Sequence, residues 1–281
     1  MSEDFNDFEW RFNRKGKPLK KAEIHRPSDI FLSKVMGKFP RESEDTLISF
    51  DWIKAAQERW KNIKKDKDKW AEIVLSNPYM IGCDVAGQGA DTTVFQHRFG
   101  RLLAYCDVSA SKDHVEISEK IYRDFSNELY DGNNKYALID TIGEGAGVYP
   151  ICKRMSGFRP VSVKFSENTQ GLTDKTKQRL FMNMRAYCYW AMRDAFDPAF
   201  GYNIAIPPDP ELEQELLVIT YDKTLHGKIR LPEKKEIKKL LKRSPDKADA
   251  FALTFYPVRR YYQEVRVADD SYNPMALIGR Y

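Results

Sequence analysis

The sequence predicts an α/β fold in which a mixed β-sheet is covered by helices on both faces. Short apolar runs separated by glycine-rich or polar turns come first, which is typical of antiparallel strands joined by hairpins. A strand–helix alternation follows, which favours parallel strands with helical connections. Hydrophobic residues make up 42% of the 281 residues and aromatic residues 13%. This composition is sufficient for a sizeable core and argues against disorder.

The first 75 residues are expected to form an N-terminal arm and a helical linker. Residues 1 to about 45 are polar, charged and weakly periodic. From 50 to 74 the apolar residues recur with helical spacing. The charge-rich stretch 61–69 interrupts this pattern, and we interpret it as a solvated turn between two helices rather than as a DNA contact.

The compact domain is expected over residues 76–257. Its strand candidates are runs separated by glycine-rich or polar turns, at 79–84, 92–98, 101–108, 136–140 and 158–165. The turn Phe99-Gly100-Arg101 predicts an antiparallel hairpin between the second and third of these runs. A glycine-rich turn and a short helix follow the fourth run, so the later strands are expected to be parallel. Antiparallel strands followed by parallel ones suit a ribonuclease H-like layout.

Helices are predicted where apolar residues recur at three- and four-residue spacing. These segments are 112–129, about 146–156, 174–195, 233–243 and about 245–256. Between the third and fourth of them the run Pro207–Pro210 breaks the chain. A β-hairpin is then expected from 216–221 and 228–231. The tail, 258–281, is rich in tyrosine and arginine and carries no structural prediction.

Charge, cysteines and hydropathy restrict the function classes. The net charge of +5, from 46 basic and 41 acidic residues, permits nucleic-acid binding without requiring it. The four cysteines form no CxxC pair, so no zinc site is expected and most should be buried thiols. The four histidines show no metal-ligand spacing, and most are expected at the surface or in turns. No signal peptide and no apolar run of about 18 residues occur, which predicts a cytoplasmic protein without a membrane span.

Three aspartates are the strongest candidates for a functional site. Asp84 and Asp140 each end an apolar strand candidate, and Asp249 lies near the start of a helix candidate. Two strands and a helix can bring such carboxylates together at one edge of a sheet. Clustered carboxylates repel one another unless cations lie between them. Oxygen ligands of this kind suit Mg²⁺ or Mn²⁺, and two such ions can cut phosphodiesters.

Other acidic residues are candidates for supporting roles. Asp246 lies three residues before Asp249, so the two share a helix face, although Asp246 could serve the helix end alone. A hairpin would return Asp91 to the neighbourhood of Asp84, as a ligand through water or as a support for the turn only. Glu144 is a reserve carboxylate, and its interpretation as an exposed loop acid is favoured.

A basic helix candidate lies immediately before the last acidic segment. Its cations could hold the DNA backbone without reading bases, which we weigh equally against an ordinary solvated helix face. The residues are Lys234, Lys235, Lys238, Lys239, Lys242 and Arg243.

The three acidic segments together resemble the nuclease domain of the large terminase subunit of tailed bacteriophages. Asp84–Val94 (D-x-A-x-x-G-x-D-x-T-V) resembles the first acidic strand of that family. Ile139–Val148 (I-D-T-x-G-x-G-x-G-V) resembles its second, and Ser244–Ala250 (S-P-D-x-A-D-A) its last acidic helix. The stretch Gly37–Ile53 is similar to the segment that joins motor and nuclease. The resemblance extends over roughly residues 30 to 256, with the motifs in the same order.

The resemblance implies a ribonuclease H-like fold and metal-dependent cutting of double-stranded DNA during genome packaging in the host cytoplasm. Carried over by position, Asp84, Asp140 and Asp249 would hold two Mg²⁺ or Mn²⁺ ions, helped by Asp246 and Asp91. Implied partners are the terminase ATPase motor, the small terminase subunit and the portal protein. No phosphate-binding loop of the motor occurs here, so no nucleotide is expected. The chain would be an isolated nuclease half, a separately encoded half or a prophage remnant.

Three alternatives stay open at this point. Another ribonuclease H-like nuclease, such as a Holliday-junction resolvase, keeps the acids and changes the DNA substrate. A packaging module without catalysis would dock on DNA or the portal, although intact acids at all three positions argue against it. A sugar-kinase-like ATPase shares this type of fold.

Overall fold

A five-stranded mixed sheet forms the centre of the protein in the computed structural model, which describes residues 45–87, 91–132 and 134–258. Its strand order is β3-β2-β1-β4-β5. The strands are β1 (Tyr79–Asp84), β2 (Thr93–Phe99), β3 (Leu102–Ser109), β4 (Lys135–Asp140) and β5 (Val161–Val163). The first three pair antiparallel, whereas β4 pairs parallel with both β1 and β5. The sheet therefore has the predicted change from antiparallel to parallel strands.

The predicted N-terminal arm and the Gly37–Pro40 part of the linker segment lie outside the described residues, as do Gly89 and the tail from 259 onward. All six residues of β1 and all seven of β2 are buried. A strand covered on both faces reads as a nearly continuous apolar run, which is how β1 was visible in the sequence, whereas β2 buries the polar residues Gln96, His97 and Arg98.

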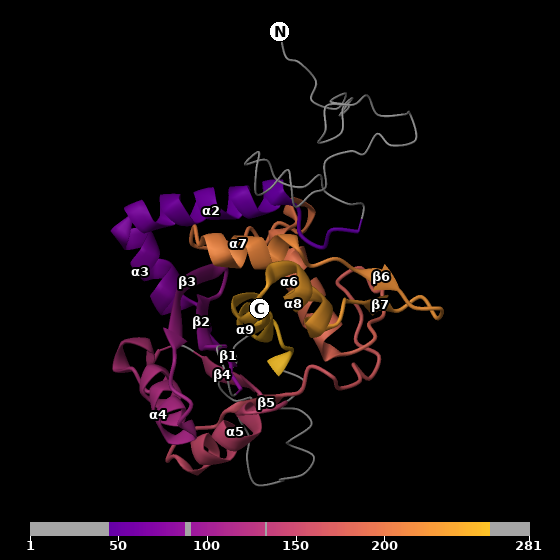
Figure 1. Cartoon of the computed structure of the whole chain (residues 1–281). Helices are drawn as coiled ribbons and strands as arrows, with labels where there is room; N and C mark the ends of the chain where they lie inside the picture. The colour runs from indigo at the N-terminus through magenta and orange to yellow at the C-terminus, as the bar shows by residue number, and fades with distance from the viewer. Residues whose placement is uncertain (1–44, 88–90, 133, 259–281) are drawn as a thin grey trace, which may run out of the picture. The chain divides into compact units, whose positions relative to one another are not determined.

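Helices cover the two faces of the sheet in separate groups (Figure 1). On one face lie α4 (His114–Phe125) and α5 (Gly145–Arg154), which pack with Ile81 and Cys83 in one core. On the other lie α6 (Met184–Phe196), α7 (Pro210–Leu217), α8 (Lys234–Leu241) and α9 (Asp246–Leu253), around a core that includes Met80 and Leu138. Because side chains alternate along β1, Gly82 and Asp84 face the α9 side.

The described residues from Asp45 onward belong to one compact unit. Helices α2 (Phe50–Lys65) and α3 (Lys67–Ser76) belong to it, and Ile53 of α2 is fully buried. The interruption between them is a single residue, Asp66, instead of the predicted loop 61–69. Its side chain accepts a hydrogen bond from Lys69 N and so begins the second helix.

Two predicted elements differ from the structure. Residues 174–183 are not helical, since the Asp174 side chain accepts hydrogen bonds from the backbone of Gln178 and Arg179 and holds a turn. The helix α6 starts only after Asn183, which caps it. The predicted strand 216–221 begins inside α7, and the hairpin that follows is limited to β6 (Asp222–Lys223) and β7 (Ile229–Arg230).

The burial of the thiols agrees with the expectation from the sequence. Three of the four cysteines are buried, and Cys106 is half-buried. None of the helices in the described part of the chain is long and apolar enough to cross a membrane. Two short 3₁₀ helices, Glu128–Tyr130 and Pro198–Phe200, complete the described elements.

Candidate metal centre

The parallel pairing of β1 with β4 places two of the three predicted aspartates at one edge of the sheet. Cys83 pairs with Ile139 in the parallel register. Asp84 and Asp140 are the next residues of these two strands, so they lie at neighbouring positions. Both residues end their strands, where the backbone leaves the sheet and the side chains can reach a ligand. Asp84 is buried and Asp140 is half-buried.

A glycine brings the third aspartate to the same edge. A Cβ atom placed on Gly82 would lie 2.0 Å from the carbonyl oxygen of Ala250, so α9 crosses β1 in direct backbone contact. Asp249 precedes Ala250, and Asp84 lies on the same face of β1 as Gly82. The missing side chain of Gly82 therefore allows α9 to carry Asp249 next to Asp84.

The ammonium group of Lys234 lies among three of these carboxylates. Its Nζ is 3.0 Å from Asp84 Oδ2, 3.1 Å from Asp249 Oδ2 and 3.4 Å from Asp246 Oδ1. From the sequence we expected Lys234 on a DNA-facing helix surface, whereas the structure turns this side chain into the acidic cluster. A cation held by three carboxylates from β1 and α9 marks a position suited to a metal ion.

Two residues that the sequence analysis missed hold Asp249. Arg185 Nε lies 3.2 Å from Asp249 Oδ1, and the Tyr189 hydroxyl donates to the same oxygen at 2.7 Å. Both come from α6, four residues apart, and therefore project from one face of that helix. Two polar residues four apart, in a helix whose middle part is mostly apolar, were the available signal. Their contacts leave Oδ2 of Asp249 directed at Lys234.

Burial and mutual repulsion change the pKa values of the cluster. Burial raises the pKa of Asp84 to about 8, with Lys234 opposing the shift and Asp249 and Asp246 adding to it. Burial also raises the pKa of Asp140 to about 6 and raises that of Asp246. Burial would raise the pKa of Asp249 as well, but Arg185 and Lys234 outweigh it, so this pKa is lower than usual. The cluster is thus short of positive charge.

The supporting candidates lie at the border of the cluster. Asp91 forms an ion pair with Lys238, whose Nζ is 2.9 Å from Asp91 Oδ2. Glu144 lies 2.9 Å from His114 Nε2, at the start of α5. Among the described residues neither has an ion pair or hydrogen bond to Asp84, Asp140 or Asp249. Their participation in metal binding therefore stays a prediction.

The remaining basic candidates divide into two kinds. Lys235, Lys238, Lys239 and Lys242 are exposed on or directly after α8. Arg243 instead contacts the buried carboxylate of Glu215, which also accepts a hydrogen bond from Ala248 N at 2.7 Å. This arrangement ties Arg243 to α7 and the start of α9.

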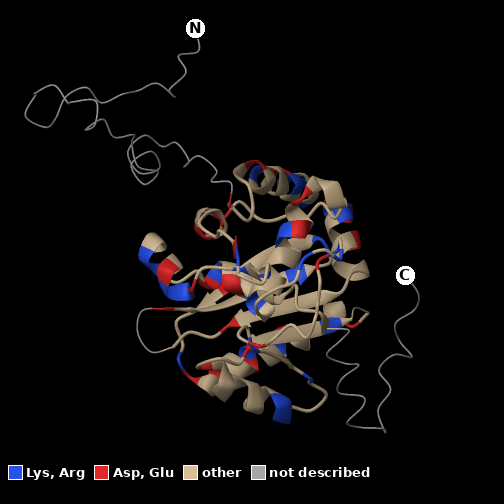
Figure 2. Cartoon of the chain, turned by 90° about the vertical axis from the view of Figure 1, so that its right-hand side faces the viewer, with Lys and Arg blue, Asp and Glu red and all other residues tan. Residues whose placement is uncertain are grey.

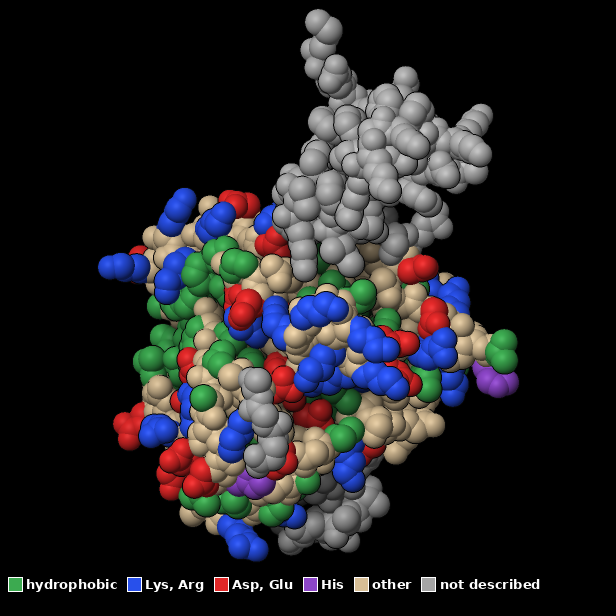
Figure 3. Space-filling model, in the orientation of Figure 1, with side chains coloured by type: hydrophobic (Ala, Val, Ile, Leu, Met, Phe, Trp, Pro, Cys, Tyr) green, Lys and Arg blue, Asp and Glu red, His purple; other side chains and the backbone are tan. Residues whose placement is uncertain are grey.

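Basic and acidic residues are interspersed over the described elements (Figure 2). In the face shown in Figure 3, several Lys and Arg side chains gather over the region of α8, beside exposed acidic side chains. A basic surface therefore adjoins the carboxylate cluster, where a polyanion would be attracted to it.

Comparison with solved structures reveals a likeness of fold. The nuclease domain of the large terminase subunit gp2 of bacterial virus Sf6 has a TM-score of 0.56 and 19% sequence identity, covering 75% of this chain and 98% of that one. A mutant of the same domain with manganese and beta-thujaplicinol has a TM-score of 0.55 and 21% sequence identity, covering 75% of this chain and 98% of that one. A mutant with calcium has a TM-score of 0.57 and 21% sequence identity, covering 75% of this chain and 99% of that one.

No protein-family model matches the sequence, and no curated protein matches it significantly. The structural likenesses show that this chain has the fold of that nuclease domain. The predicted ribonuclease H-like fold is therefore confirmed.

Proposed function

We propose that this protein is a metal-dependent endonuclease that hydrolyses phosphodiester bonds of double-stranded DNA. The observation that carries the proposal is the position of the Lys234 ammonium group, 3.0–3.4 Å from three carboxylates at the end of β1. The positive charge of this lysine already lies where the carboxylate oxygens converge. Oxygen-only donors at such a point favour Mg²⁺ or Mn²⁺ over softer metals.

The ligands of the ions would be Asp84, Asp140 and Asp249, with Asp246 as an additional carboxylate. When bound, two divalent ions supply an activated water at the phosphorus and stabilisation of the leaving oxygen. The chain's own residues prepare this chemistry, because Arg185 and Tyr189 fix one oxygen of Asp249 and leave the other directed at the Lys234 position, where an ion would bind. Lys234 has to withdraw from the carboxylates for ions to enter, since like charges repel at this distance.

The DNA backbone would be held by the exposed lysines of α8 and the residue after it: Lys235, Lys238, Lys239 and Lys242. Contacts of this type neutralise phosphates, weaken with salt and carry little sequence information. Arg243 is left out of this set because Glu215 engages it.

The biological setting follows from the resemblance to the terminase family and the likeness of fold. We infer that the cutting serves phage genome packaging in the cytoplasm of a bacterial host. The partners would be the ATPase motor, the small terminase subunit and the portal protein. No translocation by this chain is proposed.

Cleavage of a supercoiled plasmid in Mn²⁺, Mg²⁺ or EDTA tests the proposal directly. We expect the wild-type protein to nick or linearise the plasmid with a divalent ion. The Asp140→Asn variant should cleave at least about 100-fold more slowly, because the isosteric removal of one charge weakens ion binding. Asp68→Asn, which removes an exposed charge on α3, should keep full activity.

Either of two outcomes would reject the proposal. One is a folded wild-type protein without cleavage in either ion, which would favour a docking module. The other is equal cleavage by wild type and Asp140→Asn, which would place the activity elsewhere. Preference for a branched over a linear duplex would change the substrate to a junction while keeping the metal centre.

A further inference from the structure

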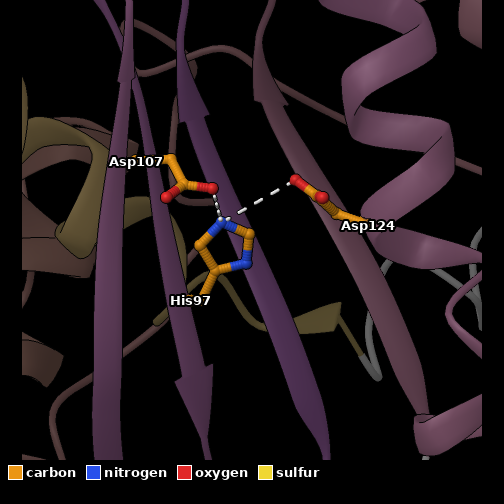
Figure 4. A group of neighbouring side chains, drawn as sticks. All are labelled: His97, Asp107 and Asp124. Carbon is orange, nitrogen blue, oxygen red and sulfur yellow. Dashed lines mark ion pairs between the residues drawn. The ribbon is translucent and has the colours of Figure 1, made fainter.

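A second cluster of metal-ligand residues lies on the opposite face of the sheet from the catalytic candidates. It contains His97 of β2, Asp107 of β3 and Asp124 of α4. Figure 4 shows both carboxylates directed at the imidazole ring. From the sequence we expected the histidines mostly at the surface or in turns, whereas His97 is fully buried, with 0% of its surface exposed.

The imidazole of His97 is fixed in orientation and leaves one nitrogen without a hydrogen bond. Its Nδ1 is 2.7 Å from the Tyr79 hydroxyl, and its ring stacks on Tyr105 with 4.2 Å between centroids. Its Nε2 is buried and has no hydrogen-bond partner. A buried polar atom without a good hydrogen bond is costly, and a bound ion would remove this cost.

The spacing of the ligand atoms fits a metal ion better than it fits hydrogen bonds. His97 Nε2 lies 3.5 Å from Asp107 Oδ2 and 3.9 Å from Asp124 Oδ2, both too long for good hydrogen bonds. Tetrahedral zinc with bonds of about 2.0–2.1 Å separates neighbouring ligand atoms by about 3.3 Å. The two distances from His97 Nε2 exceed that spacing by about 0.2 Å and about 0.6 Å, and all three ligand atoms lie within 4.8 Å of one another.

We propose that His97, Asp107 and Asp124 form a second metal site, which binds a transition-metal ion of the Zn²⁺ class. An imidazole ligand favours Zn²⁺ or Co²⁺ over Mg²⁺, in contrast to the oxygen-only catalytic cluster. The Tyr79 contact at Nδ1 orients the ring, as partners of metal-bound histidines commonly do. An ion at this site joins α4 to β2 and β3 and therefore stabilises the fold.

Lys120 competes with the metal for the two carboxylates. Its Nζ lies 2.7 Å from Asp107 Oδ2 and 2.9 Å from Asp124 Oδ2, on the same oxygens that face His97. The side chain of Lys120 is 24% exposed, so it can swing toward solvent when an ion enters. The ammonium group makes the affinity moderate, and its removal strengthens metal binding.

Titration with Co²⁺ in a variant lacking the catalytic cluster tests this site separately from the proposed nuclease function. The background is Asp84→Asn/Asp140→Asn, treated with EDTA and dialysed, with folding verified by circular dichroism. We expect one Co²⁺ per chain by calorimetry, with visible absorption bands that Zn²⁺ abolishes. Adding Asp124→Asn should weaken binding at least tenfold, whereas Asp131→Asn, an aspartate 64% exposed, should leave it unchanged.

The substitution Lys120→Gln should change the Co²⁺ affinity in the opposite direction. In the same background it should tighten Co²⁺ binding about tenfold, because the competing charge is removed. A wild-type titration in excess Mg²⁺, which fills the oxygen-only cluster, should give the same Co²⁺ stoichiometry and does not depend on the folding of any variant. Absence of Co²⁺ binding there, or binding unaffected by Asp124→Asn, would show that the cluster is only an ion-pair network around Lys120.

Discussion

At the scale of single residues, the candidate centre depends most on a residue without a side chain. Gly82 lies in the middle of β1, where a glycine normally weakens a strand. Here it lets the backbone of α9 touch the strand, and this contact sets the separation of Asp84 and Asp249. Asp84 and Asp140 were predictable because each visibly ends an apolar run. The structural role of Gly82 was not predictable, since its contact partner, Ala250, is more than 150 residues away in the sequence.

Replacing Gly82 with alanine tests this role. The new methyl group would meet the Ala250 carbonyl at 2.0 Å, and backbone cannot rotate away as a side chain can. We expect a loss of about 3 kcal/mol in the free energy of unfolding, at the upper end of overpacking effects. Mn²⁺ affinity should fall with it, because α9 is pushed from β1. Chemical denaturation and calorimetry measure the two effects.

The matched control is Gly132→Ala, at an exposed glycine with no atom within 4 Å of the added methyl group. It should leave stability within about 0.5 kcal/mol of wild type. An equally stable Gly82→Ala protein with unchanged Mn²⁺ affinity would show that α9 is not held by this contact.

At the scale of elements, the sequence predicted those whose signal is local. Strand β1 begins and ends where its apolar run does, at Tyr79 and Asp84. Helix α7 was missed because the run Pro207–Pro210 was interpreted only as a break. In the structure Asp209 accepts hydrogen bonds from the first helical turn and Pro210 occupies it, which is a regular helix start. The same segment therefore starts a helix, although its prolines suggest only an interruption.

Helix α8 is the element on which DNA binding would depend. Lys235 and Lys239 are exposed, and each phosphate contact contributes about 0.9 to the slope of log affinity against log salt. We expect Lys235→Ala/Lys239→Ala to weaken duplex binding in low salt and to reduce that slope by up to about 2. Fluorescence anisotropy of a labelled duplex in EDTA, over a series of KCl concentrations, measures both without cleavage.

The control for α8 uses two lysines from the charged region that we interpreted as solvated. Lys65→Ala/Lys69→Ala removes the same charge from α2 and α3 at exposed positions. Its slope should equal that of wild type. If both double variants lower the slope equally, binding responds to net charge alone, and α8 is not the DNA-binding element.

At the scale of the whole molecule, the centre is assembled from parts that no local pattern connects. Lys234 belongs to α8, Arg185 to α6 and Asp84 to β1, and they meet only because the helices pack on one face of the sheet. Sequence periodicity predicts that α6 and α8 are helices, yet it does not determine which face a lysine at the start of a helix turns to. The carboxylates could therefore be predicted, while the cations that balance them could not.

The charge balance of the whole protein makes its stability depend on pH in a defined direction. Burial raises the pKa of Asp84 to about 8, of Glu215 to about 7 and of Asp140 to about 6. Between about pH 4 and about pH 8 the folded chain then binds more protons than the unfolded chain, so stability falls as the pH rises. The lowered pKa of Asp249 acts only below this range.

Thermal unfolding in EDTA and in saturating Mn²⁺, from about pH 5 to about pH 8, measures this dependence. In EDTA we expect the melting temperature to decrease with pH, by about 2–4 °C for each kcal/mol lost. In Mn²⁺ the decrease should be much smaller, because bound ions require ionised carboxylates and binding releases protons. A residual decrease should remain from Glu215, whose partners are Arg243 and Ala248. A melting temperature that rises with pH in EDTA would mean that the aspartates are already balanced by Lys234 and Arg185, and that no metal is needed to stabilise the centre.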